Sequence, residues 1–460
     1  MSEQSATLQC LDRTRLARLV DRERATYVAA HPRSQALAVD GRDGLLAGVP
    51  MSWMSMLTGD FPLYFSEARG NRITDVDGIT YIDFCLGDTG AMTGHSPAPV
   101  VAAIRDRLET NGGITTMLPT ADAAEVGRDL RRRFGLPYWQ FALTATDANR
   151  WVLRMCRQVQ KRPKVLVFSH CYHGSVDETI LIVGPDGQAR SKRGNVGPQV
   201  DPTQTTRVVE FNDVEALRAA LEPRDVACVL MEPALTNIGI VPPAEGFLEA
   251  VRGLCDETGT LLINDETHTF SAGPGGCTAA WDLRPDVITI GKAIASGVPM
   301  GAYGVTAELA ERILSDHDAD LVDQGGVGGT LAGNALSSAA ARATLSLVLT
   351  DAAFEGMIAL ATRYTEGVQE VLDTRGVPWS IQQLGARAEY RFCPELPRNG
   401  GESAAAGDPE LDEYMHLYMI NRGILMTPFH NMALMCPTTS VADVDRHTEL
   451  YGQAVDELFS

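Results

Sequence analysis

The sequence predicts an α/β protein with a large, mostly parallel sheet and a second, smaller unit. From about residue 86 to 335, short apolar runs alternate with stretches of helical periodicity, which is typical of parallel strands joined by helices. The runs at 164–169, 228–232, 261–266 and 286–292 lack the polar alternation of a strand with one wet face. A chain of 460 residues suits a large domain beside a smaller one better than a single small core.

Helical patterns flank this alternating region on both sides. Residues 11–30 precede it, and one long helical region is expected from about 335 to 372. The tail at 443–459 again has helical periodicity. The segment 398–407 is rich in Gly, Ala and Ser, and its composition predicts a surface loop.

Composition excludes several classes of protein. With 45% hydrophobic and 21% charged residues, the chain has the make-up of a soluble enzyme. A net charge of −20 without a basic stretch argues against nucleic-acid binding. The nine cysteines are scattered without metal-ligand spacing, so we expect no structural metal and no disulfide framework. The N-terminus is polar and no apolar run is long enough to cross a membrane, so we expect a cytoplasmic protein.

Two reactive residues stand at the ends of apolar runs, and together they indicate which kind of reaction the protein catalyses. Asp265 closes the run at 261–266 and Lys292 closes the run at 286–292. The carboxyl ends of parallel strands line one crevice, so both side chains are expected to face the same ligand. A lysine in such a crevice can form a Schiff base, and a buried carboxylate can keep a pyridine nitrogen protonated. This pair is the minimum set of groups for pyridoxal phosphate chemistry.

Six short motifs then follow one another in an order that resembles the class III (fold type I) pyridoxal-phosphate aminotransferases. Within that family the chain looks closest to the group of glutamate-1-semialdehyde aminomutase and the β-amino-acid transaminases. The resemblance implies a pyridoxal-phosphate-binding domain at 86–335 and a smaller α+β domain built from both chain ends, 1–85 and 336–460. The motifs lie at 72–78, 143–149, 171–174, 264–267, 290–304 and 328–334.

The resemblance assigns roles around the cofactor ring. Lys292 would be the Schiff-base lysine and proton carrier, and Asp265 would pair with the pyridine nitrogen. Tyr172 would stack on the ring, and Thr267 stands where the family packs a residue against the ring face. His268 replaces a commonly apolar residue, and we interpret it as a hydrogen-bonded histidine behind the site or as a titratable group beside the pocket.

The resemblance also places the cofactor phosphate. Ala145 and Thr146 would open a helix whose N–H groups face the phosphate, with Ala145 in place of the family's glycine. Thr330 stands where a threonine reaches the phosphate in the neighbouring subunit, which implies a homodimer with shared active sites. Glu232 matches an acid near the hydroxyl side of the cofactor.

Substrate recognition departs from the family pattern. The N-terminal loop at 48–56 has no arginine, although relatives use one there to bind the substrate carboxylate. Arg387 and Arg391 are candidates to replace it, or they pair with nearby acids. Trp53 and the methionines around it predict an apolar pocket wall, or core packing.

The tail supplies two further candidate substrate contacts. Phe429 and His430 align with a stretch that borders the pocket in the family. Together with Trp53, they predict a substrate with an apolar or aromatic side.

The resemblance implies an aminotransferase that moves an amino group from an amine or amino acid to a keto acid or aldehyde by a ping-pong mechanism. The alternative is an aminomutase or racemase that returns the amino group to the same molecule. A nicotinamide-dependent oxidoreductase lacks support, because the glycines at 325–329 do not follow a strand and open a helix. The remaining alternative is a non-catalytic protein that shares this fold but has lost cofactor binding.

Overall fold

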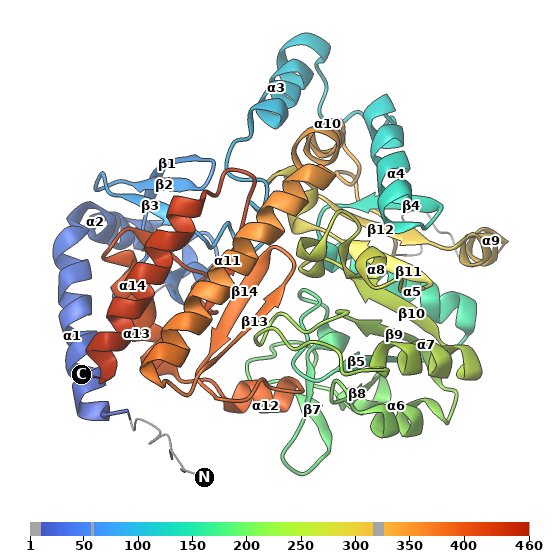
Figure 1. Ribbon diagram of the computed structural model, residues 1–460. Helices are drawn as coiled ribbons and strands as arrows, with labels where there is room; N and C mark the ends of the chain where they lie inside the picture. Colours follow the sequence, from blue (N-terminus) through green and yellow to red (C-terminus); the bar gives the residue numbers. More distant parts are fainter. Residues whose placement is uncertain (1–10, 57–58, 316–325, 460) are drawn as a thin grey trace.

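The computed structural model describes residues 11–56, 59–315 and 326–459. Within these residues, seven strands form the central sheet (Figure 1). From one edge to the other they are β4 (Tyr138–Ala142), β12 (Gly301–Val305), β11 (Val287–Ile290), β10 (Leu261–Asp265), β9 (Val226–Met231), β5 (Lys164–Phe168) and β8 (Thr206–Val209). Strand β12 is antiparallel to both its neighbours, and the other pairs are parallel. The predicted mostly parallel sheet is confirmed.

The register of this sheet brings the two chemically informative strand ends together. In the β10–β11 pair, Asp265 lies opposite Thr289. Lys292 follows β11 directly, after Gly291. The strands point the same way, so both side chains emerge at the carboxyl edge of the sheet, where ligands of open α/β folds bind.

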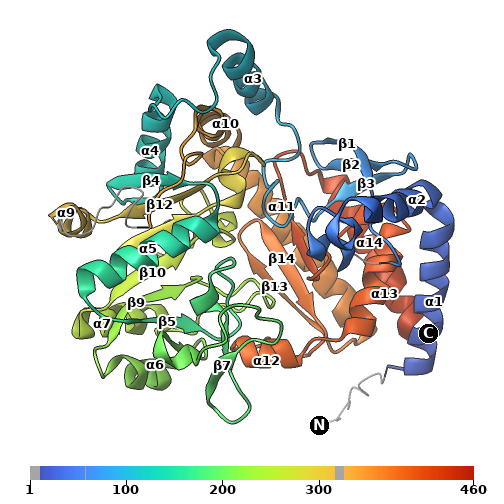
Figure 2. The same ribbon diagram turned by 180° about the vertical axis from the view of Figure 1, so that it is seen from behind.

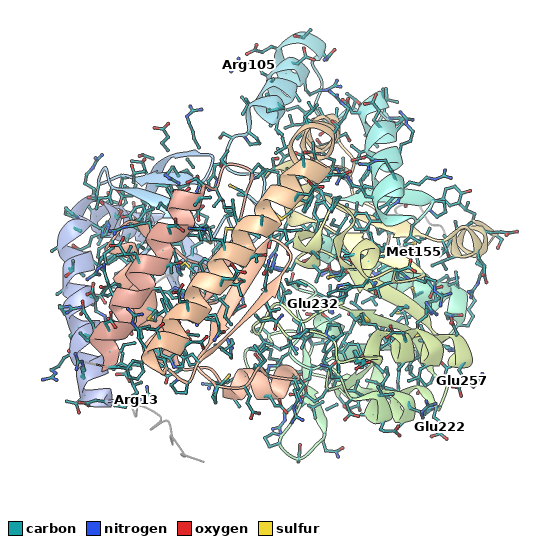
Figure 3. The ribbon with its side chains drawn as sticks, viewed as in Figure 1. Arg13, Arg105, Met155, Glu222, Glu232 and Glu257 are labelled. Carbon is teal, nitrogen blue, oxygen red and sulfur yellow. The ribbon has the colours of Figure 1, made fainter. Side chains whose placement is uncertain are left out.

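Helices cover both faces of the sheet. Figure 2 shows α5 (Ala145–Gln160) crossing one face, and Figure 1 shows α6 (Val214–Leu221) and α7 (Phe247–Thr258) on the other. Helix α5 buries one side, on which Met155 lies, whereas Glu222 and Glu257 are at the surface (Figure 3). The same part of the chain adds α3 (Ala98–Asp106), α4 (Ala121–Phe134), α8 (Gly276–Ala280), α9 (Ala307–Ser315) and the ribbon of β6 (Leu181–Val183) and β7 (Ala189–Ser191).

Two smaller sheets lie outside the central one, and both ends of the chain meet in the first of them. The first contains β1 (Phe65–Arg69), β2 (Arg72–Asp75), β3 (Thr80–Asp83) and β15 (Ile424–Leu425), and the second contains β13 (Ser380–Leu384), β14 (Arg387–Arg391) and β16 (Met432–Leu434). Strand β15 pairs in parallel with β3, although more than 300 residues separate them. The surrounding helices are α1 (Arg13–Ala30), α2 (Pro32–Asp40), α13 (Pro409–Ile420) and α14 (Val441–Phe459). Figure 1 shows the N-terminal and C-terminal helices side by side.

The predicted long helical region from about 335 to 372 consists of two helices, because the chain turns between them. Helix α10 (Ala335–Ala343) continues into a π turn at Thr344–Val348, and α11 (Asp351–Arg375) starts anew. Thr350 is the N-cap of α11, and its hydroxyl accepts a hydrogen bond from the backbone N–H of Ala353. In the described part of the chain no single helix meets the length and apolar composition of a membrane span. The pair Ala335–Val348 and Asp351–Arg375, bent by 69°, meets them only jointly.

The prediction of a surface loop at 398–407 is wrong in part, because this segment contains the short helix α12 (Gly400–Ala405). Asn399 caps this helix by accepting from the N–H of Glu402. Gly400 packs so closely that a Cβ there would lie 2.3 Å from the carbonyl oxygen of Ser169. A composition rich in Gly, Ala and Ser here serves close helix packing as well as a turn.

Candidate active site

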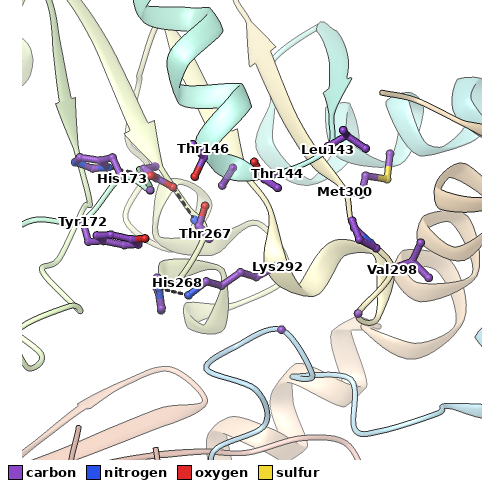
Figure 4. Close-up of a pocket in the computed structure, with 16 residues that line it drawn as sticks. Leu143, Thr144, Thr146, Tyr172, His173, Thr267, His268, Lys292, Val298 and Met300 are labelled. Carbon is purple, nitrogen blue, oxygen red and sulfur yellow. Dashed lines mark hydrogen bonds and ion pairs between the residues drawn. The ribbon is translucent and has the colours of Figure 1, made fainter. Parts of the chain in front are cut away.

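A cavity of about 360 Å³ lies at the carboxyl edge of the central sheet (Figure 4). Its walls include six of the residues expected to bind the cofactor, namely Ala145, Thr146, Tyr172, Asp265, Thr267 and Lys292. Gly90, His173 and His268 also line it. Residues as far apart in the sequence as Gly90 and Lys292 therefore meet in one site.

Lys292 lies in a tight turn that follows β11. Its φ is +48°, a conformation that costs free energy for a side-chain-bearing residue and is concentrated at functional sites. Its Nζ donates to Oδ2 of Asp88 at 2.8 Å and lies 2.7 Å from Nε2 of His268. His268 is therefore beside the pocket, and Asp88 is a contact that sequence reasoning missed.

Asp265 ends β10 and is almost completely buried. Its Oδ2 accepts hydrogen bonds from Nδ2 of Asn149 and Nδ1 of His173, each at 2.8 Å, and its Oδ1 accepts from the N–H of Thr267 at 3.1 Å. Burial works against the charged form, but the hydrogen bond and charge of His173 outweigh it and lower the pKa of Asp265. The carboxylate therefore stays ionised, as needed to hold a protonated pyridine nitrogen.

Asn149 positions this carboxylate and was also missed from the sequence. It lies on the buried side of α5, where its Oδ1 accepts from the hydroxyl of Thr289 at 2.6 Å while its amide donates to Asp265. A buried asparagine at a helix position facing the sheet is the signal that could have found it, because a buried amide needs partners.

The start of α5 has the geometry that an anion site requires. Thr144 caps the helix by accepting from the N–H of Asp147, and Thr146 Oγ1 accepts from the N–H of Ser175 at 3.3 Å. Ala145 is helical and has no positive φ, so no glycine is required there. Room for its methyl group comes from Gly291, where an added Cβ would lie 2.9 Å from that of Ala145. The free N–H groups of the first turn and the helix dipole favour a phosphate.

A hydrogen bond links the backbone of Tyr172 to the side chain of Glu232. The N–H of Tyr172 donates to Oε1 of Glu232 at 3.1 Å, and Oε2 of Glu232 accepts from the N–H of Thr236 at 3.0 Å. Glu232 lies in the interior (Figure 3), and burial raises the pKa of its carboxyl group. It does not line the cavity but fixes the backbone from which the Tyr172 side chain projects.

The residues present fit pyridoxal phosphate. Within the described chain, Thr267 Oγ1 and His173 Nε2 are buried without a hydrogen-bond partner. Thr267 lines the cavity, so its hydroxyl is available to a polar substituent of a bound ring. The cavity offers one group for each part of this cofactor. An ionised carboxylate matches the ring nitrogen, and a half-exposed tyrosine matches the ring face. A lysine matches the aldehyde, and a helix N-terminus matches the phosphate.

The remaining predicted residues lie outside the cavity walls. Thr330 is exposed at the surface. Trp53 and Phe429 meet edge to face, with ring centroids 6.2 Å apart, and each is nearly half exposed. His430 Nδ1 lies 3.5 Å from Oε1 of the buried Glu389. The structure thus pairs Trp53 with Phe429 but sets His430 against an acid.

The two candidate arginines differ in their partners. Arg391 lies 3.9 Å from Glu389, as expected for a residue that pairs with an acid. Arg387 is completely buried and donates to Ser271 Oγ, Thr89 Oγ1 and the carbonyl oxygen of His268, each at 2.8 Å. Its donors are thus occupied within the protein, and it does not line the cavity.

Comparison with known proteins agrees with this geometry. The family described as Aminotransferase class-III matches residues 54–451. A glutamate-1-semialdehyde 2,1-aminomutase from Brevibacillus brevis is 31% identical over 409 residues, covering 87% of this chain and 92% of that protein.

Solved structures are similar over nearly the whole chain. A glutamate-1-semialdehyde-aminomutase from Pseudomonas aeruginosa PAO1, crystallised as a variant in complex with PMP, has a TM-score of 0.94 and 46% identity. The similarity covers 97% of this chain and 99% of that one. A β-phenylalanine aminotransferase from Variovorax paradoxus has a TM-score of 0.83 and 25% identity, covering 96% and 97%. The protein has the fold type I architecture, uses pyridoxal phosphate and belongs to the class III aminotransferase family.

Proposed function

We propose that the protein is an aminomutase, which moves an amino group between carbons of one substrate molecule. The observation that carries this proposal is the 46% identity, over 97% of the chain, to a solved glutamate-1-semialdehyde-aminomutase. Curated relatives at 31% identity bear the same name. The sequence motifs favoured transfer between two molecules, with an aminomutase as the alternative, and the similarity to aminomutases supports that alternative better.

The side chains of the cavity divide the work of such a reaction. Bound pyridoxal phosphate supplies an electron sink for charge that develops at the substrate carbon. We assign Lys292 to carry the proton between carbons and Asp265 to keep the ring nitrogen protonated. The start of α5 at Ala145 and Thr146 would hold the phosphate, and Tyr172 would lie against the ring.

Turnover without an amino acceptor tests the aminomutase directly. Glutamate-1-semialdehyde and other small molecules with neighbouring amino and carbonyl groups are supplied to the loaded enzyme, with no keto acid added. We expect many product molecules per active site, because an aminomutase regenerates its cofactor within each cycle. Turnover that stops after about one equivalent and resumes only when a keto acid is added would contradict the proposal.

Transfer between two molecules remains the second candidate because of the N-terminal loop. That loop lacks an arginine at 48–56, and its Trp53 packs edge to face on Phe429 at 6.2 Å. These features favour a substrate with an apolar side, and a structural relative at 25% identity is a β-phenylalanine aminotransferase. In this case, an aromatic amine together with a keto acid would give a ketone or aldehyde in solution.

We also propose that two chains form a homodimer with shared active sites. Thr330 is exposed, and its neighbour Leu331 is 50% exposed. The N–H of Ala335 donates to the carbonyl oxygen of Ile114, which ties this segment to a loop where Met117 is 84% exposed. Exposed apolar side chains on adjoining segments favour a covered interface.

Mixed dimers test whether Thr330 serves the partner's site. Thr330→Ala should weaken cofactor binding about 10- to 100-fold, the usual cost of a lost hydrogen bond to a charged group. A dimer of one Thr330→Ala chain and one Lys292→Ala chain should regain one site of full affinity. This site takes its lysine from the first chain and its threonine from the second. If titration of the mixed dimers finds only weak sites, Thr330 does not act across an interface.

A further inference from the structure

The loop that follows β3 has an unusual backbone. Residues 86–89 have φ values of +46°, +59°, +49° and +81°, and only Gly87 adopts this region without steric cost. Thr89 is β-branched, which makes its conformation a marked outlier. Asp83 stabilises the loop, since its Oδ1 accepts from the N–H of Leu86 at 2.9 Å. Such conformations persist where the surrounding structure enforces them, and they are concentrated at functional sites.

This strained loop places two side chains beside Lys292. Asp88 Oδ2 accepts from the lysine Nζ at 2.8 Å. Thr89 Oγ1 lies 3.2 Å from Nδ1 of His268, whose Nε2 is 2.7 Å from the same Nζ. Arg387 donates to Thr89 and so fixes the far side of the loop. Lys292 thus lies between the carboxylate of Asp88 and the imidazole of His268. Both groups are held in place by contacts of the strained loop.

Charged and titratable groups face Asp88 from several elements. Lys292, His268, His430 and Arg387 contribute positive or protonatable groups, whereas Tyr172 and Cys85 are neutral neighbours. Burial opposes ionisation of Asp88, but the charge of the adjacent Lys292 outweighs it and holds the pKa of Asp88 far below its ordinary value. Burial, with the charge of Lys292, lowers the pKa of His268 well below its usual range. One permanent anion and one neutral acceptor therefore flank the lysine.

We propose that Asp88 is a further catalytic residue, which stabilises the ammonium of Lys292 each time the lysine holds a proton taken from the substrate. The inference deepens the proposed function and depends on the role assigned to Lys292. The proton moves from one carbon to Lys292 Nζ and on to the next carbon, while Asp88 keeps its charge throughout. A carboxylate at 2.8 Å favours the charged lysine, and neutral His268 accepts a hydrogen bond without adding charge.

The chain offers a direct test, because it contains just four lysines, Lys161, Lys164, Lys192 and Lys292. Cofactor-free protein is treated with trace acetic anhydride at pH 8, and mass spectrometry measures acetylation of each lysine. In Asp88→Asn, we expect Lys292 to react about tenfold faster relative to Lys192, because the neutral amide no longer stabilises the ammonium form of Lys292 through the 2.8 Å contact. Asparagine tolerates positive φ, so this substitution removes the charge while leaving the backbone conformation accessible.

Two further variants make the test decisive. Asp88→Gly fits the φ of +49° without strain and should give the same rise if Asp88→Asn fails to fold. Asp373→Asn removes a carboxylate from the exposed side of α11 and should leave the ratio unchanged. An unchanged Lys292 ratio in Asp88→Asn and Asp88→Gly would overturn the proposal.

The catalytic consequence is measured separately. Single-turnover rates with protiated and deuterated substrate should show proton transfer slowed about 100-fold in Asp88→Asn, with a larger isotope effect. Equal rates in variant and wild type would refute the catalytic role. Acetylation needs no substrate, so a changed ratio supports Asp88 even if the aminomutase assay fails, and that failure would then count against the reaction alone.

Discussion

Lys292→Ala is expected to lower kcat/KM at least about 10⁴-fold. The substitution removes the amine that we assign both to hold the cofactor and to move protons, and general acid–base catalysis alone contributes about 10²- to 10⁴-fold. Lys292 Nζ lies in the cavity, 2.8 Å from Asp88 and 2.7 Å from His268. Steady-state kinetics measure the loss, and circular dichroism confirms that the variant is folded.

The matched control for this variant is Lys192→Ala, which removes a lysine that does not line the cavity. It should retain the wild-type rate. A Lys292→Ala enzyme that keeps more than a few per cent of kcat/KM would show that another group carries the proton, and the assignment of the site would be wrong.

Asp265→Asn is expected to lower kcat/KM about 10³-fold with little change in structure. The amide has nearly the same shape but carries no charge, and its single oxygen can accept from either Asn149 or the N–H of Thr267, not from both. Without the negative charge the pyridine nitrogen is no longer held in its protonated form, so the ring withdraws fewer electrons. Single-turnover rates of the loaded variant measure the effect on the chemical step.

Asp265→Glu separates charge from position. It retains the carboxylate but adds a methylene in a buried site, so it should bind cofactor less tightly while losing less of the chemical rate than Asp265→Asn. If Asp265→Asn reacts within tenfold of the wild type, the charge at this position is not what activates the ring.

The parts of the site that could be predicted from sequence are those fixed by local pattern. Apolar runs predicted β10 and β11, and the strand ends then predicted that Asp265 and Lys292 share an edge. Ala145, Thr146, Tyr172 and Thr267 followed from the resemblance of short motifs to the class III family, and they line the same cavity. Their roles toward cofactor remain proposals.

Other features depend on tertiary contacts or unusual backbone geometry. Asp88 lies 204 positions from Lys292, on a loop whose left-handed conformation no local pattern indicated. Asn149 closes the motif at 143–149 but was given no role, since its importance arises only where α5 crosses β10 and β11. The break before α11 depends on a single capping threonine, Thr350, within a long region of helical periodicity.

Substrate recognition was the least predictable part for a similar reason. Arg387 had the chemistry to bind a carboxylate, but its guanidinium is buried and bonded to Ser271, Thr89 and His268. An arginine that fixes the Asp88 loop and one that binds substrate look the same in sequence. Burial and hydrogen-bond partners distinguish them.

Whether Lys292 is the residue that holds pyridoxal phosphate can be measured on the protein itself. Borohydride treatment of the purified, loaded protein fixes the cofactor to the lysine that carries it, and peptide mass spectrometry then locates the added mass among the four lysines. We expect one pyridoxyl group per chain, on Lys292. Modification at Lys161, Lys164 or Lys192 instead, or a protein that carries no cofactor after incubation with pyridoxal phosphate, would contradict it.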